Sequence, residues 1–179
     1  MPGLKGRWVS FASLVLGAVL VPLASQNASA APVALSGSIQ PVSKTPVAGK
    51  PRRAYISRPN LTVDERKAMV TFEVVLKMRN FDQLQSRVSR RERVSPQEMA
   101  ATYEPSADNY QAVVQWLTGQ GFTISRRDSH HTVIFVHGSV NRIEQALGTT
   151  FARVQADGKE YTSAITAPQV PANIAPLLV

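Results

Sequence analysis

The chain has 179 residues, which suits one ordinary domain with appendages, because single domains commonly run about 100 to 200 residues. An apolar fraction of 44% and a charged fraction of 18% are typical of a globular protein and exclude a wholly disordered one. The absence of cysteine excludes disulfides and thiolate metal sites, and 20 basic against 12 acidic residues give a formal net charge of +8. Such a surface suits an acidic protein, anionic lipid or nucleic acid, and charge alone does not choose among them.

The first thirty residues have the pattern of a secretory signal peptide. Lys5 and Arg7 precede an uncharged apolar run at 8–23, and a small-residue site follows at 28–30. We therefore predict cleavage after Ala30 and export to the periplasm or the medium, with no stable membrane anchor on the product. An uncleaved anchor is the alternative, but the run is shorter than the roughly 20 residues that a spanning helix needs.

Residues 31–69 are predicted to form a flexible linker rich in proline, serine and alanine. Prolines recur in this segment without a sustained apolar period, so it buries too little surface to offset the entropy of ordering. A basic cluster at 50–53 lies inside it. A solvated charge run is favoured there over a contact with a membrane or a polyanion.

Folded structure is predicted from residue 70 onward. Alternating apolar and polar residues indicate a strand at 70–78. Asn80 can then cap a helix in which Phe81, Leu84 and Val88 share one apolar face. Arginines crowd the end of this helix, where the helix dipole favours cations.

Two helix-start signals follow. Ser95, with Pro96 and Glu98 after it, combines a capping hydroxyl with proline and glutamate in the first turn, which predicts a short helix over about 96–103. A second helix is predicted to begin at Ser106. Its apolar face consists of Tyr110, Val113, Val114 and Leu117.

The rest of the pattern alternates between strands and one more helix. Segments 122–125 and 132–136 are predicted to pair as a hairpin. Ser139 caps a predicted helix over 140–147, and strand character resumes at 150–155.

The resulting order of strand, helices, strand, strand, helix and strand predicts an α+β fold. It is the split βαβ, or ferredoxin-like, plan, in which helices cover one face of a four-stranded antiparallel sheet. The short helix at 96–103 is then an insertion in the first crossover. This plan hosts many unrelated activities, so function has to come from sites.

Ser139 is the candidate nucleophile, and neither it nor the three histidines form a recognisable catalytic motif. A hydrolase often places its serine in a G-x-S-x-G turn, which is absent, and Ser139 is better explained as a helix cap. His130, His131 and His137 flank one predicted strand, whereas a metal site usually needs three or four convergent ligands. Solvated turn and strand-end positions are favoured for them, and a pH-sensing role is left open.

Other site chemistry is equally unsupported. Glu104 and Asp108 lie near one predicted helix start, where the helix dipole explains them without acid and base chemistry. Nucleotide-binding and calcium-binding motifs are missing. We therefore predict no catalytic, cofactor-binding or metal-ligating residues and no enzymatic activity.

A set of short motifs occurs in an order that resembles the activation domain, or propeptide, of sedolisin and kumamolisin-type serine-carboxyl peptidases. Segment 94–106 is similar to the family's LTPEEF…YGPS stretch, and segment 113–124 to its VxxWL…GL helix and the strand after it. Segment 143–151 is similar to VEQAFGT. The resemblance covers roughly residues 70–179, which we predict to be the activation domain.

Two departures from the family pattern affect what the resemblance implies. The stretch written PgSPxY before the first motif is absent, and arginines and glutamate at 90–93 stand in its place, so the resemblance implies no peptidase contact for that region. The family continues into a subtilisin-like domain with Ser-Glu-Asp catalytic residues. No positions of this sequence match them.

The resemblance implies a protein that docks on a peptidase catalytic domain as inhibitor and folding chaperone. An extended tail can bind a substrate groove by strand addition. The expected contacts are the basic surface and the tail residues Thr166, Ala167, Pro168, Gln169, Val170 and Pro171. Packing of this tail on its own sheet is the alternative.

The leading hypothesis is thus an exported, non-catalytic protein that acts on a sedolisin-type peptidase in trans. A truncated remnant of a peptidase precursor without a partner is the second hypothesis. A basic, nucleic-acid-binding ferredoxin-like domain is the third, which is disfavoured by export and by the lack of an aromatic RNA-binding strand.

Overall fold

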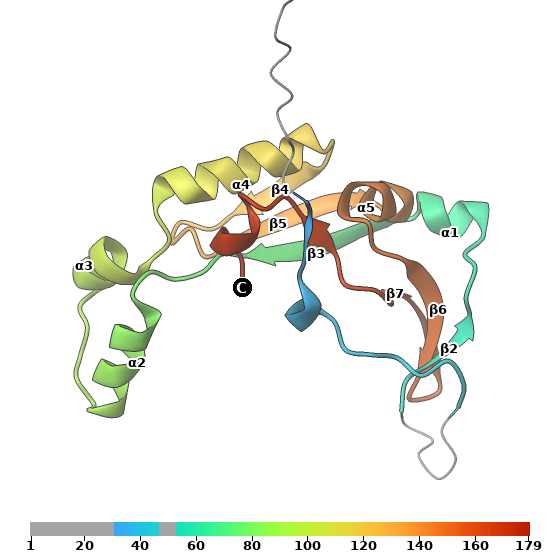
Figure 1. Cartoon of the computed structure of the whole chain (residues 1–179), viewed down its shortest axis with the longest axis horizontal. Coiled ribbons are helices and arrows are strands. Elements are labelled where there is room, and N and C mark those ends of the chain that lie inside the picture. The colour runs from blue at the N-terminus through green and yellow to red at the C-terminus, as the bar shows by residue number, and fades with distance from the viewer. Residues whose placement is uncertain (1–30, 47–52) are drawn as a thin grey trace, which may run out of the picture.

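A computed structural model describes residues 31–46 and 53–179 (Figure 1). The predicted signal peptide at 1–30 and most of the basic cluster at 50–53 lie outside these residues. Within the two described ranges, no helix is long and apolar enough to cross a membrane.

The centre of the molecule is a three-stranded antiparallel sheet in the order β3-β5-β4. It is formed by β3 (Met69–Val75), β5 (Val133–Ser139) and β4 (Thr123–Arg127). Helices α4 (Ala107–Gly119) and α5 (Val140–Leu147) lie over one face of this sheet (Figure 1). The predicted α+β class, with helices on one face of an antiparallel sheet, is confirmed.

The main core lies between these two helices and the sheet. All four residues of the predicted apolar face of α4 are buried, because helical spacing places them together toward β5. On the sheet side, Leu76, Ile134 and Val136 are at most 2% exposed. Ser106 and Ser139 accept hydrogen bonds from the backbone amides of Asn109 and Arg142, which confirms the predicted helix start at Ser106 and the predicted cap at Ser139.

A second antiparallel sheet has the order β2-β6-β7. It consists of β2 (Tyr55–Arg58), β6 (Phe151–Ala156) and β7 (Lys159–Ala164). The segment predicted as the fourth strand of the central sheet is β6, and its ladder partners are β2 and β7 instead of β3. Asp157 and Gly158 both have positive φ angles, of 50° and 75°, and this tight turn makes β7 the local partner of β6.

The range predicted as a linker, 31–69, contains further secondary structure. Strand β1 (Val33–Ala34) pairs with β8 (Gln169–Val170), and the 3-10 turn η1 (Ser36–Ser38) follows β1. Helix α1 (Val63–Lys67) begins with a capping box and contacts α5. The pairing partners of β1 and β2 lie about a hundred or more residues away along the chain, so local composition does not reveal them.

The chain between β3 and α4 forms a helical arm, which projects from the sheet (Figure 1). The arm consists of α2 (Phe81–Ser89), α3 (Pro96–Glu98) and the π-helical turn η2 (Met99–Tyr103). Ser95 caps α3 as predicted, since its hydroxyl accepts a hydrogen bond from the amide of Glu98.

The apolar face predicted for the first arm helix is only partly buried. Leu84 is buried, but Phe81 and Val88 are 49% and 62% exposed. The predicted cap is also different, because Asn80 adopts a left-handed conformation and its side-chain amide donates to the carbonyl of Thr102 at 3.0 Å. Phe81 and Val88 are exposed because the arm projects away from the central sheet, so the sheet does not cover α2 (Figure 1).

Gly138 in β5 makes room for an aromatic ring. A Cβ atom at this position would lie 2.7 Å from Cδ1 of Phe122, which is 4% exposed and packs edge-to-face on Phe72. We predict that Gly138→Ala lowers the free energy of unfolding by about 1–3 kcal/mol, because the ring has to shift within a packed core. Chemical denaturation measures this loss. Gly119→Ala is the matched control, since nothing lies within 4 Å of its new Cβ, and an equal loss there would contradict the explanation.

Candidate interaction site

The serine and the histidines considered as candidate catalytic residues contact neighbouring residues of the fold. Ser139 Oγ accepts the amide hydrogen of Arg142 at 3.3 Å. His137 Nδ1 lies 3.0 Å from Thr71 Oγ1 on the neighbouring strand, and the ring of His131 lies 4.8 Å from that of Tyr110. In the part of the chain that the structure describes, no three histidine, aspartate or glutamate side chains are grouped to hold a metal ion.

His130 and Glu104 form a pair that the sequence pattern did not reveal. Nδ1 of His130 lies 2.7 Å from Oε1 of Glu104, whose side chain is only 11% exposed. The β4–β5 turn holds the histidine there, because the carboxylate of Asp128 accepts hydrogen bonds from the amide and the hydroxyl of Thr132. These hydrogen bonds lower the pKa of Asp128, and the hydrogen bond with Glu104 raises the pKa of His130. The partners are 26 residues apart, so no local signal points to the pair.

The His130–Glu104 pair should respond to pH in a defined direction. Because the folded pKa of His130 is raised above its ordinary value of 6.5, the pair stabilises the fold fully below pH 6.5 and loses this contribution as the pH rises through the folded pKa. An NMR titration of the His130 ring should therefore show a raised midpoint that returns toward 6.5 in Glu104→Gln. Asp108→Asn is the control and should leave the midpoint unchanged. An unchanged midpoint in Glu104→Gln would refute the pairing.

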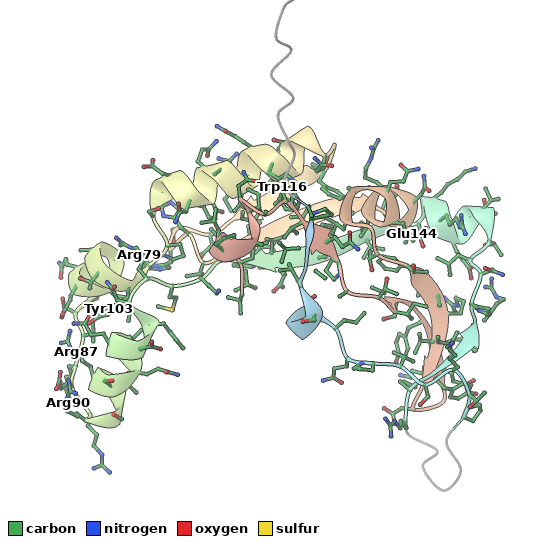
Figure 2. All side chains as sticks on the ribbon, viewed as in Figure 1. Arg79, Arg87, Arg90, Tyr103, Trp116 and Glu144 are labelled. Atoms are coloured by element: carbon green, nitrogen blue, oxygen red, sulfur yellow. The ribbon has the colours of Figure 1, made fainter. Side chains whose placement is uncertain are left out.

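Arginines in the arm hold its parts together (Figure 2). The guanidinium of Arg87 bonds to the carboxylate of Glu98, to the hydroxyl of Tyr103 and to the carboxylate of Glu92, and these contacts, that with Glu98 above all, raise the pKa of Arg87. Arg79 donates to two carbonyl groups within η2, including that of Ala101 at 2.8 Å, and to the carbonyl of Glu104 just after it. Part of the basic surface that the sequence suggested for partner contact is therefore engaged within the arm.

The predicted contact tail, 166–171, runs from a bend at Thr166 into the short strand β8. Thr149 Oγ1 donates to the carbonyl of Thr166 at 2.5 Å, and the amide of Leu35 donates to the carbonyl of Pro168 at 2.9 Å. Gln169 and Val170 form β8, and Val170 is 2% exposed. Much of this stretch thus packs on its own fold, and Thr166 and Gln169 are its exposed members.

The face of the central sheet opposite the helices presents a mixed apolar and polar surface, which we call the open sheet face. Its strand residues are Met69, Thr71, Glu73 and Val75 of β3 and Val133, Phe135 and His137 of β5. Met69 and Val75 are 56% and 44% exposed, and the Arg126 guanidinium lies 3.8 Å from the centre of the Phe135 ring. The alternation of apolar and polar residues in β3 is the sequence signal for this face, but no motif in the sequence points to a role for it.

A second ion cluster joins α1 to the second sheet. Glu65 lies 2.6 Å from Arg58 and 3.6 Å from Arg153, and Arg153 also bonds to Glu160 at 2.8 Å. The hydrogen bond from Arg58 is the main reason that the pKa of Glu65 falls from 4.5 to about 2. The carboxylate of Glu65 therefore stays charged in mild acid.

This cluster should survive at pH values that protonate ordinary carboxylates. A lowered pKa means that Glu65 stabilises the fold above its unfolded value near 4.5 and loses this contribution as the pH falls through about 2. A carboxylate NMR titration should find a midpoint near 2 that moves up toward 4.5 in Arg58→Met. Arg66→Met, on the same helix, should not move it. A midpoint near 4.5 in the unaltered chain would disprove the prediction.

The protein is an α+β domain, and the ionic and hydroxyl side chains described above form hydrogen bonds and ion pairs within the domain. Residues 61–178 match the family model described as Pro-kumamolisin, activation domain. The chain belongs to this family. It corresponds to the activation domain of a peptidase precursor and not to the catalytic domain, as the motifs from 94 to 151 predicted.

One curated relative is Kumamolisin from Bacillus sp. (strain MN-32), which is 25% identical to this chain over 143 residues. The similarity covers 74% of this chain and 25% of the relative. The chain therefore spans about a quarter of the length of the curated relative that it matches.

Proposed function

We propose that this protein is exported and binds the catalytic domain of a sedolisin-type serine-carboxyl peptidase in trans, as inhibitor or folding chaperone, without catalytic activity of its own. The observation that carries the proposal is the family match over 61–178, which spans the central sheet, both covering helices and the tail. Export rests on the signal-peptide pattern at 1–30.

Two surfaces are proposed to contact the peptidase. The open sheet face offers exposed apolar side chains around Phe135, which suits a protein interface whose centre is apolar and whose rim is polar. The tail at 166–171 is extended, and an extended segment fits a groove that binds extended substrate. Val170 is buried in the free domain, and the hydroxyl of Thr166 accepts a hydrogen bond from the amide of Thr150 at 2.7 Å. Gln169 is therefore the exposed tail side chain available for a first contact.

An inhibition and refolding assay tests this function. The chain, purified after export, is mixed with the catalytic domain of kumamolisin, and peptide hydrolysis is followed across a pH series. In parallel, the denatured catalytic domain is refolded with and without the chain. Inhibition or a higher yield of active peptidase is expected. If neither effect occurs with kumamolisin or with other sedolisin-type peptidases, the proposed function is wrong.

A further inference from the structure

Strand β3 has one edge that is only partly paired. Its other edge pairs with β5, and the bond from the amide of Leu76 to the carbonyl of Thr132 sets the register. In an antiparallel ladder, alternate residues bond to opposite neighbours, so the amides and carbonyls of Thr71 and Glu73 point away from β5. In the described part of the chain, no backbone group bonds to them.

The same edge already accepts an extended segment at its far end. The amide of Lys77 donates to the carbonyl of Leu177 at 2.8 Å, and the amide of Val179 donates to the carbonyl of Val75 at 3.1 Å. Leu178 lies opposite Leu76 in antiparallel orientation. The contact follows the short turn η3 (Ala175–Leu177). It shows that this edge can form a ladder, and the free stretch of β3 is continuous with it.

An apolar groove lies beside the free stretch. It has two adjacent hollows of about 410 and 210 Å³, and both are lined by Phe72, Glu73 and Leu147. Trp116 of α4, which is labelled in Figure 2, is among the residues that line the larger hollow, and Ser38 of η1 contributes to both hollows. The split βαβ plan places its fourth strand beside the first, so this groove occupies the position that β6 would have filled had it paired with β3.

We propose that the groove binds an extended segment of a partner polypeptide, which adds a strand to β3 antiparallel to it and in line with Leu177–Val179. About five residues would span the edge from Val74 to Val70, a usual length for a strand. The segment's amides and carbonyls would pair with those of Thr71 and Glu73. Strand addition of this kind takes its affinity from main-chain bonds and its specificity from alternate side chains.

The side chains along β3 define the chemistry of the partner. Residues directly opposite each other share a face of the sheet, so partner residues opposite Val74 and Phe72 would enter the groove and should be apolar. The residue opposite Glu73 would lie on the open sheet face beside this exposed carboxylate. A lysine or arginine is favoured there, because opposite charges across a pair of strands attract.

The test uses the exported chain and an acetylated, amidated peptide of sequence Val-Lys-Leu-Thr-Val, without any peptidase. Its result is therefore independent of the proposed function. Titration followed by amide hydrogen exchange should show saturable protection of the Thr71 and Glu73 amides. Methylating the backbone nitrogens at the second and fourth positions of the peptide should abolish binding. Methylating the third should leave it intact, because that nitrogen points away from β3.

A charge exchange distinguishes this register from general apolar binding. Glu73→Lys should weaken binding of the lysine peptide by about two- to fivefold and improve binding of a matching peptide with glutamate at the second position by a similar factor. Asp82→Lys on α2 is the control for net charge. It should neither weaken binding of the lysine peptide nor improve binding of the glutamate peptide by these factors. Absence of binding, or binding without protection of Thr71 and Glu73, would overturn the proposal. Equal tolerance of all methylated peptides would also overturn it.

Discussion

Phe135→Ala should raise the inhibition constant against a sedolisin-type peptidase by about 30-fold or more, because aromatic side chains at the centre of an interface contribute most of the binding free energy. Phe135 is the aromatic residue of the open sheet face, and the Arg126 guanidinium over its ring adds a cation beside the apolar surface. The inhibition constant is measured at a fixed pH and salt concentration. Unfolding of the variant is followed in parallel, so that a loss of binding is not mistaken for a loss of folding.

Phe81→Ala is the matched control for this prediction. Phe81 is 49% exposed on α2, in the arm that projects away from the sheet (Figure 1), and it undergoes the same change of residue type. Its inhibition constant should stay within about threefold of the unaltered chain, since most surface positions contribute little to binding. A large effect at Phe81 and none at Phe135 would assign the contact to the arm instead of the sheet face.

Leu117→Ala should lower the free energy of unfolding by about 2–5 kcal/mol, because it removes buried methyl groups and leaves a cavity. Leu117 is fully buried in α4 and packs in the main core with residues of the central sheet and of the C-terminal segment. Urea denaturation followed by circular dichroism gives the midpoint and the slope. An unchanged slope with a lower midpoint identifies a loss of stability in an otherwise intact fold.

Val88→Ala provides the comparison for the core substitution. Val88 is 62% exposed on α2, so its truncation should change stability by less than about 0.5 kcal/mol. A loss at Val88 equal to that at Leu117 would mean that the arm belongs to the cooperative core. The arm buries Leu84 and Tyr103 but otherwise depends on the contacts of Arg87 and Arg79.

The elements of the central sheet were predictable because their signals are local. The alternation in β3, the spacing of Tyr110, Val113 and Leu117 in α4, and the capping serines at 106 and 139 each act within a few residues. The same spacing was misleading in α2, where Phe81 and Val88 resemble a buried face. A helical period shows which residues share a face but not whether another element covers it.

The candidate site divides in the same way. The tail at 166–171 was identified from its sequence, but its contacts within the domain were not. Its partner strand β1 lies near the other end of the described chain, and Thr149 lies 17 residues before Thr166. The pairing of His130 with Glu104 and the ion cluster around Glu65 likewise join distant segments. No single-sequence pattern encodes such contacts, because they depend on how the elements pack.

The α+β class, the helix starts at Ser95, Ser106 and Ser139 and the resemblance to the activation-domain family could be predicted from the sequence alone, because periodicity, capping chemistry and motif order are local signals. The pairing of β6 with β2 and β7 depends on the three-dimensional packing, and so does the stretch of the β3 edge, beside an apolar groove, that has no backbone partner among the described residues. The physical reason is that strand pairing is a competition between distant segments for the same backbone hydrogen bonds, and its outcome is settled by packing of the whole domain.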